Sequence, residues 1–100
     1  MDVKISKEGA KTLVTLVGRL DTTNAEQFRE DIASLMEDPQ PDFELDCADM
    51  DYTSSQGLRM FLMLQKTVSS KGGKMVMTNM KPQVKEVFDI TGFSNIIKIL

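Results

Sequence analysis

Apolar and polar residues alternate along some segments of this 100-residue chain and follow a helical repeat along others. Alternation is typical of strands with one buried face, whereas apolar residues three and four positions apart are typical of amphipathic helices. The pattern predicts two strands joined by a turn at Glu8-Gly9-Ala10, and further strands at 42–47, 75–78 and 96–100. It predicts three helices, whose apolar positions span residues 25–36, 58–68 and 84–90.

The second strand of the opening hairpin carries an ambiguous pattern. Leu13, Thr15 and Val17 are predicted to alternate with polar residues, and Leu16 interrupts that alternation. We therefore expect both faces of this strand to be buried near its end, and we expect Gly18 to terminate it.

The first helix has clear start and stop signals. Thr23 and Glu26 have the spacing of a capping box, in which each side chain binds the other residue's backbone amide. Pro39 and Pro41 are expected to stop the helix, since proline cannot continue it. The apolar positions predicted to face the core are Ala25, Phe28, Ile32, Leu35 and Met36.

The order of these elements is β β α β α β α β, which predicts an α/β fold. Strands separated by single helices favour parallel neighbours with right-handed crossovers, and the hairpin adds an antiparallel edge. We expect a mixed, mostly parallel sheet of four to five strands with helices packed against it, as one domain over residues 1–100. Loops at the carboxyl ends of such strands gather at one edge, which would bring together Asp21–Asn24, Thr53–Gln56 and Thr78–Lys81.

The most informative stretch runs from Thr53 to Gly57, between a predicted strand and the second helix. Serine and threonine accept hydrogen bonds from the free amides of a first helical turn, and glycine allows close approach to a neighbour. An exposed hydroxyl at the positive end of a helix is also a natural site for a regulatory phosphate. From the residues alone, plain helix capping and a modification site both stay open.

The second helix has two contrasting sides. Arg59, Met63 and Lys66 are predicted to lie opposite the apolar face, so that Met63 points outward between two cations. Methionine is common at partner-binding surfaces, although a single exposed one needs no explanation. The apolar positions predicted to cover the sheet are Leu58, Met60, Phe61, Leu64 and Val68.

Composition removes several classes of function. The chain has no histidine and a single cysteine, Cys47, which excludes histidine-dependent triads and the usual zinc sites and is expected to be a small core residue. The net charge of −3 argues against direct binding of nucleic acid. The acids are concentrated in residues 37–51 and most lysines follow residue 66, a polarity that either steers a partner or is only a solvated surface.

Location and catalysis are constrained in the same way. No apolar run approaches the ~20 residues of a membrane span, and the N-terminus does not resemble a signal peptide, so we expect a cytoplasmic protein.

Asp21, Asp49 and Asp51 are the candidate acids or bases of an enzyme, but the sequence shows no set of catalytic groups with perturbed pKa values around them. We expect neither catalysis nor a cofactor or metal.

Four motifs, in order and spacing, resemble the STAS domain of bacterial anti-sigma-factor antagonists. Gly18-Arg19-Leu20-Asp21 resembles the family's Gly-x-Leu-Asp motif, and Tyr52 to Leu58 resembles its central serine-glycine-leucine motif. Lys74-Met75-Val76 and the run from Pro82 to Gly92 resemble its C-terminal half. The resemblance covers nearly the whole chain.

This resemblance implies a phosphorylation switch. The unphosphorylated antagonist would bind an anti-sigma factor that is also a serine kinase, which frees the sigma factor; phosphorylation would break the complex and a phosphatase would restore it. The family's serine lies two residues before the glycine, which corresponds to Ser55. Ser54 is the second candidate because it is an adjacent hydroxyl, and it stands where many members have an aspartate. Asp21 corresponds to an acidic residue near the kinase contact.

The expected partner-binding residues combine both lines of reasoning, and we expect a monomer in the free state. The alternative is the same fold used as a scaffold or a transporter-subunit interaction module without a phosphorylation switch, since fold does not determine function. The predicted contact residues are Asp21, Thr22, Thr53, Ser54, Ser55, Gln56, Gly57, Arg59, Met63 and Lys66.

Overall fold

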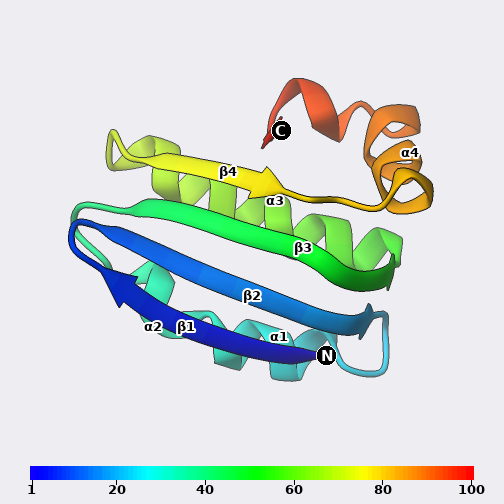
Figure 1. Ribbon diagram of the computed structural model, residues 1–100, viewed down its shortest axis with the longest axis horizontal. Coiled ribbons are helices and arrows are strands. Elements are labelled where there is room, and N and C mark those ends of the chain that lie inside the picture. The colour runs from blue at the N-terminus through cyan, green and yellow to red at the C-terminus, as the bar shows by residue number, and fades with distance from the viewer.

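A computed structural model describes all 100 residues and contains one five-stranded sheet in the order β1-β2-β3-β4-β5 (Figure 1). β1 is antiparallel to β2 and every other neighbouring pair is parallel, which confirms the predicted mixed, mostly parallel sheet. The strands are β1 (Asp2–Glu8), β2 (Lys11–Leu20), β3 (Asp42–Thr53), β4 (Lys74–Thr78) and β5 (Lys98–Ile99). The helices are α1 (Ala25–Asp31), α2 (Ala33–Met36), α3 (Ser55–Ser70), α4 (Pro82–Ile90) and a 3₁₀ segment, Phe93–Asn95.

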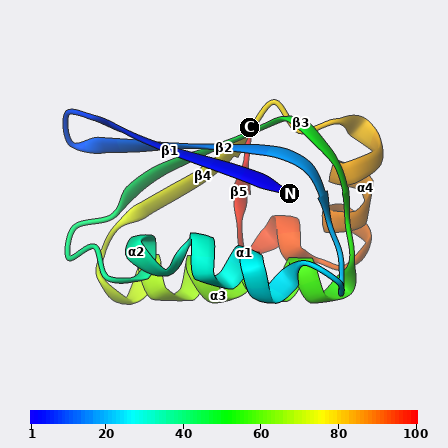
Figure 2. The ribbon, with the colours of Figure 1, turned by 90° about the horizontal axis from the view of Figure 1, so that it is seen from below.

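The helices cover one face of the sheet. α1, α2 and α3 run beneath it, α4 lies at one end, and no helix covers the opposite face (Figure 2). Between the two layers lies a core of 19 buried apolar side chains. Phe61 of α3 is at its centre, with ring centroids 5.4 Å from Phe28 of α1 and 6.0 Å from Phe88 of α4. Burial of these large rings joins three helices around one site.

β2 shows that the predicted alternation was one residue out of phase. Thr12, Val14, Leu16 and Leu20 are the buried residues, whereas Leu13 and Val17 lie on the face without helices and are only partly covered. The strand also does not end at Gly18 but continues to Leu20. Gly18 has φ of +102°, which glycine adopts without strain, so the strand passes through this position instead of stopping.

β3 is longer than predicted because two register shifts interrupt its alternation. Val14 is paired with Leu45, but Gly18 is paired with Met50 and Leu20 with Thr53, so β3 contains two more residues than β2 over this span. Each extra residue is a bulge that moves the next buried position three residues along instead of two. This explains why Cys47, Met50 and Thr53 are buried in a segment that the sequence pattern predicted to be partly loop.

The first helix is interrupted and its predicted cap does not form. The helical segment breaks at Ile32, between α1 and α2, although its apolar positions face the core as predicted. No side chain caps α1 at Asn24, and the Thr23 hydroxyl donates to the Asp21 carboxylate instead of binding a helix amide. The predicted capping box is therefore wrong, because Asp21 is nearer and carries a charge.

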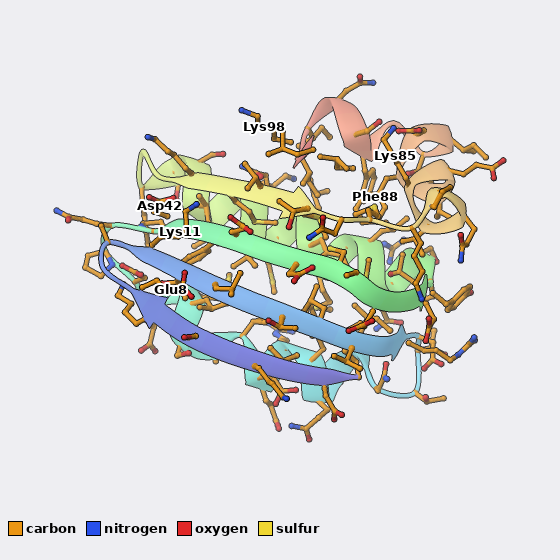
Figure 3. All side chains as sticks on the ribbon, in the orientation of Figure 1. Glu8, Lys11, Asp42, Lys85, Phe88 and Lys98 are labelled. Atoms are coloured by element: carbon orange, nitrogen blue, oxygen red, sulfur yellow. The ribbon has the colours of Figure 1, made fainter.

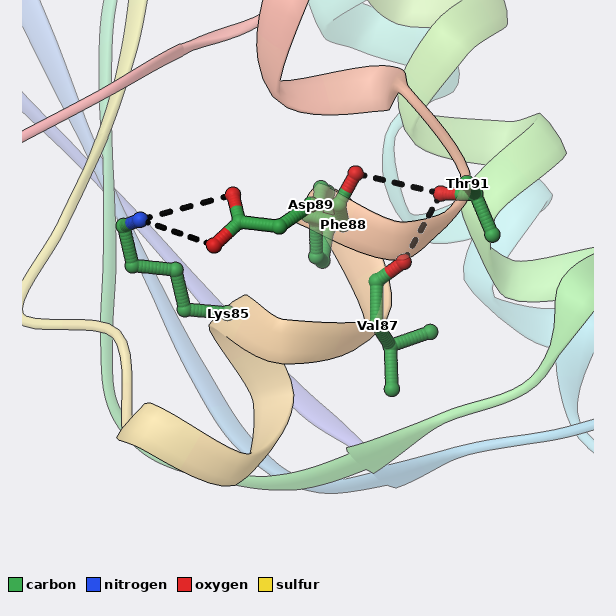
Figure 4. Close-up of polar contacts among 5 residues, drawn as sticks. All are labelled: Lys85, Val87, Phe88, Asp89 and Thr91. Atoms are coloured by element: carbon green, nitrogen blue, oxygen red, sulfur yellow. Dashed lines mark hydrogen bonds and ion pairs between the residues drawn. The ribbon is translucent and has the colours of Figure 1, made fainter.

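The C-terminal part of the chain contains less regular secondary structure than the sequence predicted. The predicted strand at 96–100 is reduced to Lys98–Ile99. Ile90 is 77% exposed, so it is not a core position of α4. α4 ends where the Thr91 hydroxyl donates to the carbonyls of Val87 and Phe88, at 2.8 and 3.2 Å (Figure 4).

Charged side chains lie around the perimeter of the sheet, as shown by Lys11, Asp42 and Lys98 in Figure 3.

Cys47 is in the core, as predicted. Its burial, with a smaller effect of the Asp46 charge, raises its pKa to about 12. The thiol is therefore not a reactive thiolate at neutral pH.

None of the helices is both long enough and apolar enough to cross a bilayer.

Candidate functional site

Three loops meet at one edge of the sheet, as the topology predicted. Leu20 and Thr53 are paired at the ends of β2 and β3, and the Ser54 amide donates to the Leu20 carbonyl at 2.8 Å. The Thr78–Lys81 loop reaches the same edge, because the Lys81 ammonium binds the Asp51 carboxylate at 2.5 Å. The segments after β2, β3 and β4 therefore border a single surface.

Three neighbouring hydroxyl residues have different environments at this edge. Thr53 is the last residue of β3 and is 3% exposed. Ser54 is the N-cap of α3, and its hydroxyl accepts a hydrogen bond of 3.2 Å from the Gly57 amide. Ser55 is the first residue of α3, is exposed, and its hydroxyl has no hydrogen-bond partner within the chain. Capping is therefore the role of Ser54, and the hydroxyl of Ser55 is free.

Gly57 holds the start of α3 tightly against the strands. A Cβ at this position would overlap the Thr53 hydroxyl and approach Leu20 Cγ to 2.9 Å. Only a residue without a side chain allows the first turn of the helix to come this close. The close approach predicted for this glycine is confirmed, and it determines where the neighbouring serines are presented.

Asp21 is an ionised carboxylate at the same edge. It accepts hydrogen bonds from the Thr23 hydroxyl at 2.5 Å and from the Thr23 amide at 2.9 Å. The hydroxyl bond is the main reason that the pKa of Asp21 lies below its ordinary value of 3.8, and the positive charge of Arg19 contributes in the same direction. The structure therefore presents a fixed negative charge beside the serine turn.

On the outer side of α3, the exposure of one side chain differs from the prediction. Arg59 and Lys66 are exposed as predicted. Met63 does not point outward between them but is partly buried against the core, because it lines a groove of about 270 Å³ between α3 and the first two helices. The other residues lining this groove are Arg29, Ala33, Met36 and Glu37.

The predicted contact residues fall into three groups by exposure. Thr53 and Gly57 are buried, so they position the turn and offer no side chain to a partner. Asp21, Ser54, Gln56 and Met63 are partly exposed. The fully exposed ones are Thr22, Ser55, Arg59 and Lys66.

Sequence reasoning missed two residues at this edge. Tyr52 is 40% exposed, although an aromatic residue at the end of a largely buried strand is expected in the core. The guanidinium carbon of Arg19 lies 4.5 Å from the centre of its ring. The regular alternation of β2 places Arg19 on the face opposite Leu20, and the correct phase of that strand was the signal that would have identified it.

The chemistry of this edge suits contact with another macromolecule. No group of three or more histidine, cysteine, aspartate or glutamate side chains is placed to hold a metal ion. What the edge presents is a free hydroxyl at a helix start, one fixed carboxylate and several exposed cations. Such a surface offers hydrogen bonds and charge to another macromolecule.

Comparison with known proteins gives consistent matches over the whole chain. A sequence model described as the STAS domain matches residues 3–100. A protein of Bordetella bronchiseptica named "Putative anti-sigma factor antagonist BtrV" is 32% identical over 99 residues, covering 99% of this chain and 85% of that protein. The "Anti-sigma-B factor antagonist" of Bacillus subtilis is 31% identical over 99 residues, covering 99% of this chain and 88% of that protein.

A solved structure shows the same fold. The anti-sigma-factor antagonist (STAS) domain protein from Planctomyces limnophilus superposes with a TM-score of 0.88 at 17% identity, covering 99% of this chain and 89% of that one.

Proposed function

Because this chain belongs to the STAS domain family and, within it, to the bacterial anti-sigma factor antagonists, we propose that it binds an anti-sigma factor and thereby frees a sigma factor. It acts as a binding protein of the cytoplasm, not as an enzyme, and residues 1–100 work as one module that is monomeric when free. Its effect on transcription is indirect, since its net charge of −3 does not favour DNA.

The proposal includes a switch at Ser55, and one observation carries it. Among the three adjacent hydroxyls, only that of Ser55 is both exposed and free of an intramolecular hydrogen bond. The anti-sigma factor is itself a serine kinase that phosphorylates Ser55, and a phosphatase reverses the modification. Ser54 is the weaker candidate, because its hydroxyl is engaged at the helix start.

The added phosphate acts on the complex and not on the fold. It carries a charge of about −1.5 to −2 and lies at the positive end of α3, where free amides stabilise an anion. The helix therefore keeps its structure. A carboxylate of the partner that faces Ser55 is repelled, and the close packing around the hydroxyl is lost.

The contact surface extends over both neighbouring segments. Asp21 and Thr22 border the serine turn on one side, and Arg59 and Lys66 continue it along the exposed side of α3. These cations suit an acidic surface on the kinase. Met63 contributes from the edge of its groove, as a partly exposed apolar contact.

Intact-mass measurement tests the switch. The chain is used to retrieve its anti-sigma factor kinase from the source cells, and the purified kinase is then incubated with the chain and ATP. The wild type gains the mass of one phosphate and Ser55→Ala gains none. The matched control, Ser54→Ala, still gains one phosphate. Modification of Ser55→Ala but not of Ser54→Ala would move the site to the neighbouring serine.

Binding to the same kinase tests the consequence of modification. Ser55→Asp loses affinity by at least about tenfold, whereas Ser55→Ala binds as the unmodified chain does, because only the first adds negative charge at the contact. A chain that binds its partner equally well in both forms, and that never acquires phosphate, would be the scaffold module without a switch.

A further inference from the structure

We propose that Arg19 and Tyr52 form a second part of the docking surface, which takes a carboxylate side chain of the anti-sigma factor. This inference rests on the proposed function and adds to it a contact that lies on the strands and not on α3.

The two side chains form one preformed unit. Arg19 of β2 and Tyr52 of β3 are directly paired across the parallel strands, and the guanidinium carbon lies 4.5 Å from the ring centre. A cation held over an aromatic ring loses rotational freedom before any partner arrives. Binding to it then costs less conformational entropy than binding to a free arginine.

The second bulge of β3 is what produces this pair. Gly18 is paired with Met50 and Arg19 with Tyr52, so Asp51 is the extra residue. In a regular strand Asp51 would be opposite Arg19, and its carboxylate would neutralise the guanidinium. The bulge instead directs Asp51 to Lys81, with which it forms an ion pair of 2.5 Å. Bulges commonly redirect a side chain at functional edges in this way.

The guanidinium consequently keeps all its donors. No hydrogen bond and no ion pair of the chain uses the side chain of Arg19, which is exposed. Asp21, the nearest acid in sequence, is occupied by the hydroxyl and the amide of Thr23. An arginine stacked on a ring presents its N–H edge to solvent, and that edge binds a carboxylate in bidentate geometry.

The unit also lies next to the proposed switch. Arg19 immediately precedes Leu20, whose carbonyl accepts the Ser54 amide at 2.8 Å, and Tyr52 is three residues before Ser55. A single protein that covers Ser55 would therefore reach Arg19 and Tyr52 as well. Arginine and tyrosine are among the residues that most often dominate binding energy at protein interfaces.

Charge selects a carboxylate-bearing protein as the occupant in place of a nucleic acid. The whole chain carries a charge of −3, Asp21 lies two residues after Arg19, and Asp49 is paired with Val17, two residues before it, so a polyanion would be repelled. A single acidic side chain with an apolar neighbour satisfies Arg19 and packs on the exposed part of Tyr52. A second copy of this chain is the other occupant that the test must exclude.

The test measures affinity for the purified anti-sigma factor kinase that the wild-type chain retrieves from cells. Arg19→Ala reduces affinity by about tenfold to a hundredfold. Tyr52→Leu reduces it by a smaller factor, because this variant removes the aromatic ring but keeps the arginine. Tyr52→Phe keeps the ring and binds as the wild type does. The matched control is Lys98→Ala, which removes an exposed cation of β5 outside every proposed contact and leaves affinity unchanged.

A double-mutant cycle shows whether the two residues act together. Arg19→Ala combined with Tyr52→Leu costs less than the sum of the single losses, since the ring acts by holding the guanidinium. Added salt weakens the wild type more than Arg19→Ala, because the lost contact is ionic. Additive losses, or equal salt dependence, would contradict the proposed unit.

The possible failures are distinguishable. Wild-type affinity in Arg19→Ala, with Ser55 still phosphorylated by the kinase, would overturn this surface and leave the proposed function intact. Arg19-dependent binding without any phosphorylation of Ser55 would support the surface and remove the switch. Loss of self-association in Arg19→Ala, measured by analytical ultracentrifugation, with unchanged kinase affinity would assign the surface to a second copy instead. If the wild type retrieves no anti-sigma factor, both proposals fail.

Discussion

Single residues at the serine turn owe their roles to backbone position and not to chemistry. Thr53, Ser54 and Ser55 carry the same functional group, but one ends a strand, one caps a helix and one begins it. Only the middle position has its oxygen in reach of a free first-turn amide, at 3.2 Å from the Gly57 nitrogen. A difference of one residue therefore separates a structural hydroxyl from an available one.

Stability measurements should separate the two serines. Ser54→Ala lowers the free energy of unfolding by about 1 kcal/mol, the usual cost of losing an N-cap side chain. Ser55→Ala changes it by less than about 0.5 kcal/mol, because the hydroxyl has no partner to lose. Urea denaturation of both variants measures the difference. Equal losses would show that Ser54 is not the cap in solution.

The pKa of Asp21 should depend on Thr23. Thr23→Val removes the hydroxyl that is the largest cause of the low value, so the pKa of Asp21 rises towards 3.8, whereas Thr23→Ser keeps it low. A carboxyl whose pKa is lower in the folded state stabilises the fold above its unfolded pKa, and this contribution is lost as pH falls through the folded pKa. Carboxyl NMR titration measures both variants. An unchanged pKa in Thr23→Val would exclude the hydroxyl as its cause.

At the scale of elements, the two bulges of β3 determine what the sheet edge presents. Without them the period-two pattern of Phe43, Leu45 and Cys47 would continue and would place the carboxylates of Asp49 and Asp51 in the core. With them, Met50 and Thr53 are both buried and Tyr52 is exposed beside Arg19. A strand that shifts phase twice cannot be recognised from alternation, which explains why this segment was predicted to be partly loop.

Removal of one bulge residue tests this account. Deletion of Asp51 converts the bulge into regular pairing and leaves Met50 and Thr53 facing the core, so it lowers the free energy of unfolding by less than about 1 kcal/mol. Deletion of Glu44, from the regularly paired part of β3, shifts the alternation and costs at least about 3 kcal/mol, the scale of losing a core side chain. Asp51→Ala keeps the bulge and removes only a half-exposed ion pair with Lys81, which costs less than about 1 kcal/mol. Thermal melts followed by circular dichroism compare the three variants. Equal losses in the two deletions would show that Asp51 is not an extra residue of β3 in solution.

The whole molecule is a sheet with one covered face, and Phe61 holds the covering layer together. Its ring contacts Phe28 and Phe88, which come from helices on either side of α3 in the sequence. The start of α3, and with it the serine turn, is therefore positioned by the core as well as by the neighbouring strands. Damage to this ring cluster should therefore displace the serine turn through the placement of α3.

Truncation of this ring should be severe. Phe61→Ala lowers the free energy of unfolding by about 3–5 kcal/mol, because a cavity remains between three helices. Domains have about 5–15 kcal/mol of unfolding free energy in total, so this loss is a large share of it. Ile90→Ala, at a position 77% exposed, changes it by less than about 0.5 kcal/mol. Urea denaturation measures both, and a mild effect of Phe61→Ala would mean that the helices pack independently of it.

The sequence by itself determined the order of the elements, the parallel sheet with its antiparallel edge, the covering face of α3 and the close approach at Gly57. These depend on local periodicity, turn residues and chain connectivity, which neighbours along the chain encode directly. The family resemblance also came from local motifs. The placement of the three loops at one edge followed from topology alone.

Only the tertiary structure decided which hydroxyl is free, where Met63 lies, and that Arg19 is stacked on Tyr52. Each of these depends on the register between strands or on packing between helices that are distant in the sequence. Two extra residues in β3 reset which side chains face the solvent, and they leave no periodic signal of their own. Contacts between distant segments, and not local pattern, therefore produce the exposed surface at this edge of the sheet.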